Sequence, residues 1–303
     1  MSLFAAISVC KVAKDAAGVA GNVFAFGLFV SPIPTFRRII RNGSTEMFSG
    51  LPYIYSLLNC LICLWYGTPL ISAHNLLITT VNSVGAVFQF VYIIIFLMYA
   101  EKAKKVRMSG LLLAVLGLFA IILVGSLQIP DILVRRLFVG FLSCASLISM
   151  FASPMFIIKF VIQTKSVEFM PFYLSLSTFL MSTSFLLYGL FNDDAFIYVP
   201  NGIGTILGII QLVLYFYYKS KPRENSREPL ISAKLVLVLE FLSNSFLLVI
   251  MKHFSIIIRE YTHHALFLSH LNVLLQLLGL LHCVVLIRTI FADIHPSLRL
   301  TIL

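Results

Sequence analysis

Two stretches of the sequence share one pattern: NSVGAVFQFVYIIIFLMY at Asn82–Tyr99 and NGIGTILGIIQLVLYFYY at Asn201–Tyr218. Each begins with asparagine, has glycine three residues later, at Gly85 or Gly204, and continues as an apolar run about as long as a membrane helix. An amide that loses water in hydrocarbon needs other hydrogen-bond partners. Each asparagine must therefore face a partner helix or a watery cavity, and the recurrence of this feature predicts two copies of one unit.

The composition predicts a polytopic membrane protein. Of the 303 residues, 60% are hydrophobic and 11% are charged, against about a quarter charged in soluble domains. Length alone would allow one or two soluble domains, but a mean hydropathy of +1.00 overrides that expectation. The net charge of +10 does not indicate a nucleic-acid partner, because the basic residues are scattered between apolar runs instead of gathered on one face.

Neither the cysteines nor the histidines have the spacing of a metal site, and we expect no metal and no cofactor. Cys60 and Cys63 lie one turn apart in an apolar segment, which favours small buried side chains over metal ligands or a disulfide. His263, His264 and His270 have no carboxylate or thiol nearby at ligand spacing. The remaining cysteines are Cys10, Cys144 and Cys283.

Seven apolar segments precede residue 220, and each is about long enough to cross a bilayer. We expect seven transmembrane helices at 17–38, 51–71, 76–99, 110–128, 137–162, 172–191 and 197–218. Leaving aside Lys11 and Lys14, thirteen basic residues follow the odd-numbered segments, whereas two, Arg135 and Arg136, follow the even-numbered ones. The positive-inside rule then predicts an extracytoplasmic N-terminus and a cytosolic end after the seventh helix.

The first three predicted helices are repeated as the fifth, sixth and seventh. After a shift of 122 residues, Ser31-Pro32 aligns with Ser153-Pro154 and Tyr66-Gly67 with Tyr188-Gly189; after a three-residue shortening, Asn82 aligns with Asn201. Because three crossings are an odd number, an unrepeated fourth helix is needed to make the two copies parallel. We therefore expect an all-α membrane protein of 3+1+3 helices. Its parts are 1–106 for the first repeat, 107–136 for the linker helix and loop, 137–219 for the second repeat, and 220–303 for a polar cytosolic tail followed by an atypical apolar extension.

Five motifs, in order along the chain, carry a resemblance to a known family. They are GLFVSPIPTFRRII at 27–40, STEMFSGLPY at 44–53, LWYG at 64–67, TKSVEFMPF at 164–172 and VPNG at 199–202. They closely resemble plant SWEET sugar transporters, the MtN3/saliva family, and the hexose-preferring first subgroup is nearest. The resemblance covers residues 17–230, whereas 231–303 depart from the short polar tails of that family.

The resemblance implies bidirectional, facilitated uniport of mono- or disaccharides by alternating access, with glucose or another hexose favoured. It implies a multi-pass protein of the plasma membrane or the vacuolar membrane, and association into a homo-oligomer. The partners expected are therefore a small sugar and the lipid bilayer, with no nucleic acid. We expect removal of residues 231–303 to preserve transport.

Within that resemblance, Asn82 and Asn201 match the paired asparagines that bind sugar. A neutral amide offers two donors and an acceptor to sugar hydroxyls, without the desolvation cost of a charge. The alternative role of these asparagines is hydrogen bonding between helices of the two halves. Cys63 and Phe185 match positions lining the family's pocket, where an aromatic ring can cover the apolar face of a pyranose. Ordinary helix packing is the alternative for both.

Tyr66 and Asp194 match the outward gate pair of the family. A phenol–carboxylate hydrogen bond at the extracytoplasmic end of the helices is charge-assisted, and we expect it to be solvent-accessible enough to break. The alternative is an interfacial tyrosine beside Trp65 and a surface loop acid.

Four prolines match the proline tetrad of the family, namely Pro32, Pro52, Pro154 and Pro171. Pro32 deprives the Leu28 carbonyl of its helical partner, and Pro154 does the same to Met150. A helix weakened in this way can kink, which predicts a hinge for the inner gate. The alternative is that prolines are common in membrane helices in general.

Other classes of function fit the sequence less well. A proton-coupled carrier usually keeps a carboxylate or histidine in the membrane, and the lack of an acidic residue at mid-helix favours uniport. A seven-helix receptor would match the helix number but not the tandem repeat. An intramembrane enzyme would need a nucleophile or paired acids in the bilayer, and we find neither, so we expect no enzymatic activity. A PQ-loop carrier of amino acids or organic acids would have Pro-Gln pairs, but Ile33 follows Pro32 and Tyr53 follows Pro52.

Overall fold

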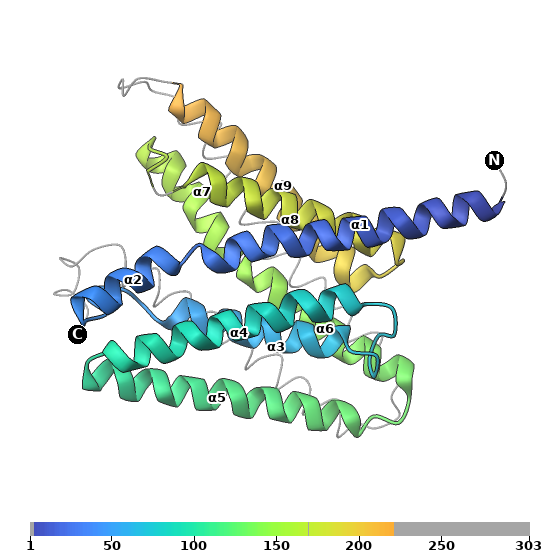
Figure 1. The fold of residues 1–303 in the computed structure, drawn as a ribbon, viewed down its shortest axis with the longest axis horizontal. Coiled ribbons are helices and arrows are strands. Elements are labelled where there is room, and N and C mark those ends of the chain that lie inside the picture. Colours follow the sequence, from blue (N-terminus) through green and yellow to red (C-terminus); the bar gives the residue numbers. More distant parts are fainter. Residues whose placement is uncertain (1–2, 169, 221–303) are drawn as a thin grey trace.

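The structure, a computed structural model, describes residues 3–168 and 170–220, which form helices joined by short connections (Figure 1). The helices are α1 Leu3–Val30, α2 Ile33–Asn42, α3 Leu51–Gly67, α4 Leu76–Tyr99, α5 Lys102–Leu127, α6 Ile132–Met150, α7 Ala152–Thr164, α8 Phe172–Phe191 and α9 Ala195–Lys219. The described part of the chain contains no strand, so the all-α prediction is confirmed there. The apolar extension expected after residue 230 lies outside the described residues.

Two crossings of the bundle are each built from two helices, because prolines interrupt them. The break between α1 and α2 falls at Pro32, which lacks the N–H that the Leu28 carbonyl would accept. Ser31 compensates, since its backbone N–H and its Oγ both donate to that carbonyl, at 3.3 and 2.8 Å. α6 and α7 likewise meet at Phe151, three residues before Pro154. The chain thus bends at the two places where the sequence predicts kinks.

Six helical stretches of the described chain are long and apolar enough to cross a membrane, counting α1 with α2 and α6 with α7. α3 is a shorter apolar helix of 17 residues and makes the remaining crossing of the 3+1+3 arrangement. Several predicted boundaries are wrong, and α6, for example, begins at Ile132 instead of 137. The first helix begins at Leu3 instead of 17, because good helix formers precede the apolar run. α3 ends at Gly67, and α5 begins at Lys102, so basic residues predicted in a loop lie on its first turns.

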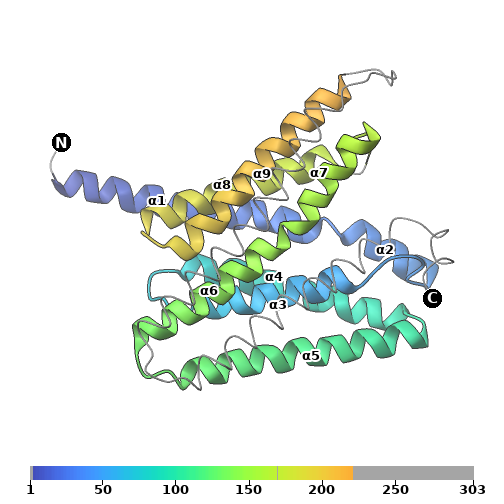
Figure 2. The ribbon, with the colours of Figure 1, turned by 180° about the vertical axis from the view of Figure 1, so that it is seen from behind.

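The two repeats meet through two equivalent contacts. Within each repeat the second and third helices form a close pair, α3 with α4 and α8 with α9. Between repeats, the first helix of one packs on the second helix of the other, α1 on α8 and α6 on α3 (Figures 1 and 2). The linker helix α5 lies along α3 at the edge of the bundle and also touches α4 and α6. This is the arrangement expected of two parallel copies related by a two-fold axis.

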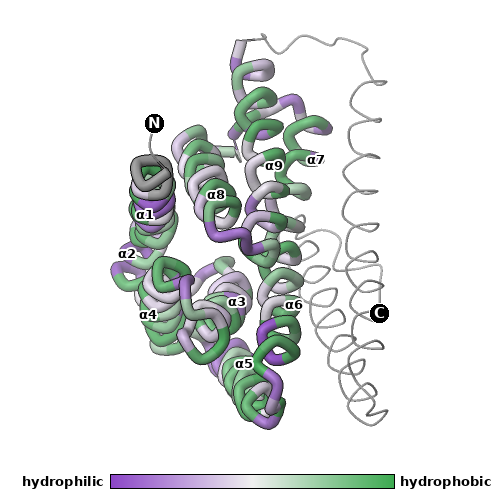
Figure 3. Tube along the Cα trace, turned by 90° about the vertical axis from the view of Figure 1, so that its right-hand side faces the viewer, coloured by the Kyte–Doolittle hydropathy of each residue, from purple (hydrophilic) through white to green (hydrophobic). Residues whose placement is uncertain are grey.

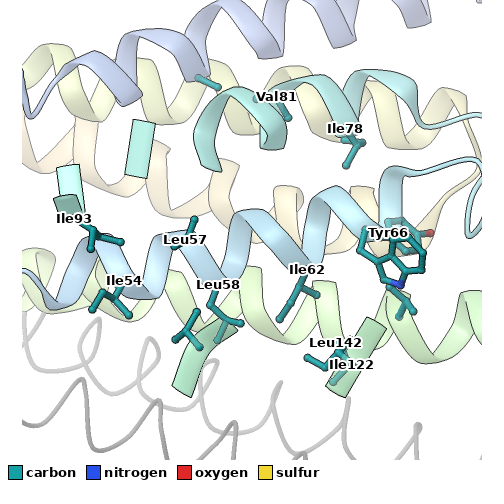
Figure 4. Close-up of a cluster of buried hydrophobic side chains, with 14 of the residues drawn as sticks. Ile54, Leu57, Leu58, Ile62, Tyr66, Ile78, Val81, Ile93, Ile122 and Leu142 are labelled. Carbon is teal, nitrogen blue, oxygen red and sulfur yellow. The ribbon is translucent and has the colours of Figure 1, made fainter. Parts of the chain in front are cut away.

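The buried core is centred on α3. Leu58 and Ile62 belong to one cluster with Ile93 of α4, Ile122 of α5 and Leu142 of α6 (Figure 4). Figure 3 shows hydrophobic residues along most of each helix and hydrophilic ones gathered near helix ends. Large apolar side chains are also exposed on the outer faces, among them Val23, Val87 and Leu113. Such a surface suits a protein whose outside contacts lipid.

The two ends of the bundle differ in charge, because the basic residues of α2 and of the first turns of α5 lie on helix turns at one of them. We call the end with connections 43–50, 100–101 and 165–171 the basic end, and the end with connections 68–75, 128–131 and 192–194 the Asp194 end. At the basic end, Arg38 donates from Nε and Nη2 to Glu46 at 3.2 and 2.6 Å, and Asn42 donates to Glu46 at 2.6 Å. The hydrogen bonds from Arg38, which has the larger effect, and from Asn42 hold the pKa of Glu46 below its usual range. Phe160 stands at the aligned position of Arg38, so the second repeat cannot form this ion pair.

Candidate functional site

Asn82 and Asn201 occupy the same position, the seventh residue of α4 and of α9. Each Nδ2 donates to the carbonyl four residues earlier, Ile78 at 2.9 Å and Ile197 at 2.8 Å. Among the described residues neither Oδ1 accepts a hydrogen bond, and no bond joins the two amides. Each amide therefore keeps its carbonyl oxygen and one N–H for another partner.

A glycine one turn beyond each asparagine brings its helix against an aromatic ring. A Cβ on Gly85 would lie 2.7 Å from the Phe29 ring, and a Cβ on Gly204 would lie 2.9 Å from the Phe151 ring. Phe29 and Phe151 are themselves aligned by the shift of 122 residues. The helix that carries the asparagine is therefore packed in the same way in both halves. In each case the aromatic ring lies three residues before the proline, Pro32 or Pro154, that interrupts the neighbouring crossing.

Cys63 and Phe185 lie on the two equivalent contacts between the repeats. Cys63 of α3 is buried, and its Sγ accepts a hydrogen bond from Ser143 Oγ of α6 at 3.2 Å. Phe185 of α8 is buried, and its ring covers Gly21 of α1, where a Cβ would lie 2.8 Å away. The shift of 122 residues aligns Cys63 with Phe185 and Gly21 with Ser143. The Cys63–Ser143 contact and the Phe185–Gly21 contact are therefore equivalent in the two repeats. No hydrogen bond of the described chain joins either side chain to the asparagines.

Tyr66 and Asp194, which are 128 residues apart, meet at the Asp194 end. The Tyr66 Oη donates to the carboxylate and lies 2.7 Å from each of its oxygens. Asp194 also accepts the Phe196 N–H at 3.1 Å, which caps the first turn of α9. The sequence-based expectation of a solvent-accessible pair is wrong, because Asp194 is 1% exposed and Tyr66 is 1% exposed. Within the connection 192–194, Asp193 is exposed, whereas the Asp194 side chain turns inward to Tyr66 at the end of α3.

Two partners of Asp194 were not predicted. Asn75 Nδ2 and Arg136 Nη2 both donate to Asp194 Oδ2, at 2.7 and 3.0 Å. Asn75 Oδ1 in turn accepts from Asn192 Nδ2 at 3.1 Å. The repeat could have revealed Asn75, because the shortened shift of 119 residues aligns it with Asp194. The shift of 122 residues aligns Arg136 with another basic residue, Lys14, but the charge pattern marks Arg136 only as a basic residue of a connection.

The Tyr66 contact has a reciprocal in the other half. Tyr188, aligned with Tyr66, donates from its Oη to the His74 carbonyl at 3.0 Å. In each repeat, a buried tyrosine lies near the end of the second helix. Its hydroxyl donates to the connection between the second and third helices of the other repeat. Both tyrosines thus tie the Asp194 end across the repeat boundary, Tyr66 through a carboxylate and Tyr188 through a neutral carbonyl.

The four prolines all lie at or near helix starts in the half of the bundle toward the basic end. Pro32 caps α2, Pro52 is the second residue of α3, Pro154 is the third residue of α7, and Pro171 immediately precedes α8. A missing N–H is tolerated best at these positions, because the first turn of a helix has no internal acceptors for its N–H groups. No group of three metal-ligating side chains occurs in the described part of the chain.

Comparison with known proteins accounts for this doubled architecture. Residues 15–104 and 137–223 match the family described as sugar efflux transporter for intercellular exchange. The chain belongs to the MtN3/SWEET family. The two SWEET segments contain the two helical repeats, and the greater part of α5 lies between them.

SWEET relatives match this chain over most of their length. It is 68% identical over 232 residues to the bidirectional sugar transporter SWEET2 of Arabidopsis thaliana, covering 76% of this chain and 98% of the relative. It is 47% identical over 218 residues to SWEET1 of the same plant, covering 72% of this chain and 88% of the relative. A solved structure of a eukaryotic SWEET transporter is 55% identical, with a TM-score of 0.69, and covers 70% of this chain and 100% of that one. The chain is thus a multi-pass integral membrane protein.

Proposed function

We propose that this SWEET protein is a bidirectional, facilitated sugar uniporter that works by alternating access, with glucose or another hexose as its preferred substrate. The observation that carries the proposal is the aligned pair of asparagines, each with an amide oxygen and an N–H left for a ligand. Sugar hydroxyls are both donors and acceptors, so they complement such amides. The SWEET1 and SWEET2 relatives are named as bidirectional sugar transporters, which supports transport over catalysis.

In this proposal the two ends of the bundle take opposite roles. The Asp194 end and the N-terminus face the extracytoplasmic side, and the basic end faces the cytosol, in the plasma or vacuolar membrane. The Tyr66–Asp194 hydrogen bond closes the outer gate, while the proline tetrad lets the inner halves of the broken helices bend. Cys63 and Phe185 line the sugar site, and the protein works as a homo-oligomer.

The test is glucose equilibration into proteoliposomes that carry the purified full chain, with and without a pH gradient. A uniporter gives saturable entry that stops at equal concentrations and ignores the gradient. L-Glucose, which offers the same groups in mirror geometry, serves as the control for leakage. Absence of saturable entry, or accumulation above equilibrium driven by the gradient, would contradict the proposal.

Tyr66→Phe is expected to favour opening of the outer gate. The hydroxyl is lost from a charge-assisted hydrogen bond, which contributes about 1.5–3 kcal/mol, so the open population should rise about tenfold or more. Spin labels at Leu70→Cys and Leu190→Cys, both exposed positions near the Asp194 end, would report the separation of the repeats by double electron–electron resonance. Cys10, which is exposed, and Cys283 are first replaced by serine so that the spin label reacts with the introduced cysteines. Cys60, Cys63 and Cys144 are buried and are kept.

Tyr188→Phe is the matched control for that gate experiment. It removes the same hydroxyl from the aligned position, but its acceptor is the neutral His74 carbonyl. A neutral hydrogen bond contributes about 0.5–1.5 kcal/mol, so the shift should be clearly smaller. Equal shifts in the two variants would contradict a special role for the Asp194 carboxylate.

Removal of residues 231–303 is expected to leave glucose entry within about twofold of the full chain, because residues 15–223 contain both family segments. Initial uptake rates, normalised to folded protein by size-exclusion chromatography, measure this. A truncated chain that is well folded yet inactive would overturn the expectation and assign the extension a part in transport.

A further inference from the structure

The donors to the Asp194 carboxylate come from both repeats. Tyr66 and Asn75 belong to the first repeat and reach across the boundary. Phe196 lies on α9, the helix that Asp194 caps, and Arg136 lies on α6, the first helix of the second repeat, although the sequence-based division assigned residue 136 to the linker; α6 packs on α9 and also on α3 of the first repeat. If the outer gate opens by separation of the repeats, the first two contacts break and the last two move with the carboxylate.

We propose that Arg136 is the resident counter-ion of Asp194, which stays paired with Oδ2 through gate opening and also binds Oδ1, the oxygen that Tyr66 alone of the first repeat contacts in the closed gate. This role rests on the proposed alternating access. It makes Arg136 a positioning residue of the gate, since it acts on sugar passage through Asp194 alone.

The guanidinium of Arg136 has a donor available for this exchange. Its Nη2 holds Asp194 Oδ2 at 3.0 Å, whereas its Nε is buried and has no hydrogen-bond partner in the described part of the chain. Nε and Nη2 form the side-on fork that binds both oxygens of a carboxylate. Arg38 makes this same fork with Glu46 at the basic end. In the closed gate, Tyr66 donates to the carboxylate of Asp194, and the Nε of Arg136 is left without a hydrogen bond in the described part of the chain.

The charge of Asp194 makes such a partner necessary. The carboxylate is 1% exposed, and removing the cation from a buried pair leaves an uncompensated charge, which is far worse than losing a neutral donor. The Arg136 side chain is 39% exposed, so water screens part of the attraction and the pair is not rigidly sealed. With Arg136 in place, the contacts of Asp194 that opening breaks are the hydrogen bonds from the uncharged Tyr66 and Asn75.

Arg136→Gln should therefore hold the gate closed. We expect the spin-label distance across the repeats to shift to its short population and glucose exchange to fall about tenfold to a hundredfold, the range for a counter-ion removed from a partly screened pair. Arg136→Lys keeps the charge without the fork, so its exchange rate should lie between those of wild type and Arg136→Gln. Arg135→Gln is the matched control, because within residues 3–168 and 170–220 the Arg135 side chain donates only to the Ile129 carbonyl, at 3.1 and 2.7 Å.

The deciding experiment adds Asp194→Asn. With no charge left to neutralise, Arg136→Gln should have little further effect in that background, both on the spin-label distances and on exchange. The proposal is overturned if Arg136→Gln leaves the distances unchanged, shifts them toward the open population, or has the same effect in the Asp194→Asn background as in wild type. If Arg136→Gln does not fold, the same cycle with Arg136→Lys decides. A wild-type chain that moves no sugar would refute the proposed function, while the distance measurements would still test Arg136.

Discussion

Alanine at both Asn82 and Asn201 should abolish saturable glucose entry while leaving a folded protein. Each substitution removes the amide that would satisfy a sugar hydroxyl, and an unsatisfied polar group costs about 1–3 kcal/mol, so each single variant should lose about tenfold to a hundredfold in transport efficiency. The loss should appear as a raised KM, since the missing contact is made to bound sugar. Initial rates of glucose entry over a range of concentrations measure this.

The asparagine pair has a sharp alternative, which the same variants separate. If the amides only joined helices, their loss would lower the melting temperature and the yield without changing KM. The structure already limits that role, because each Nδ2 donates to its own helix, to Ile78 or Ile197. Ser83→Ala is the control, since the Ser83 Oγ also donates four residues back along α4, to Thr79 at 2.8 Å. A Ser83→Ala variant with the same rise in KM would contradict a specific sugar site at Asn82.

The repeat explains which parts of the site the sequence could predict. Residues that recur at a fixed shift, such as the asparagines and the tyrosines, are visible as pairs in the amino-acid sequence alone. Pro32 and Pro154 are visible for a second reason, since proline removes a backbone donor wherever it stands. The 3+1+3 arrangement and the broken helices therefore followed from sequence. The start of α1 did not, because good helix formers extend the helix toward the N-terminus beyond its apolar segment.

The missed residues share a different cause. Arg136 meets Asp194 because the Asp194 side chain alone of the connection 192–194 is buried, and no pattern in the chain specifies its inward direction. A positive φ of 50° at Asp193, in the left-handed region, makes this turn. Charge counting treats Arg136 as a topology signal and Asp194 as a loop acid, so it places both on the surface. The contact that joins them is tertiary and asymmetric, and only the structure supplies it.

Alanine at Gly189 should be among the most destabilising single changes in the protein. A Cβ there would lie 2.6 Å from the Tyr198 backbone nitrogen and 3.0 Å from its Cα, so backbone rather than a flexible side chain would have to move. Gly67 has the same relation to the aligned Thr79 nitrogen, at 2.8 Å. Overpacking of this kind costs about 1–3 kcal/mol, and more where neighbours cannot shift. The melting temperature in detergent should fall by several degrees in each variant.

This close approach also determines where the gate residues stand. Gly189 follows Tyr188, and pushing α8 away from the first turn of α9 displaces Asp194 at the start of that helix. We therefore expect Gly189→Ala to loosen the Asp194 end as well as to lower stability, which the spin-label distances would detect. Gly117→Ala is the control, because a Cβ at Gly117 meets nothing within 4 Å and alanine favours the helix. Equal melting temperatures for Gly189→Ala and Gly117→Ala would show that α8 and α9 have room to separate, and the gate geometry derived from their contact would then fail.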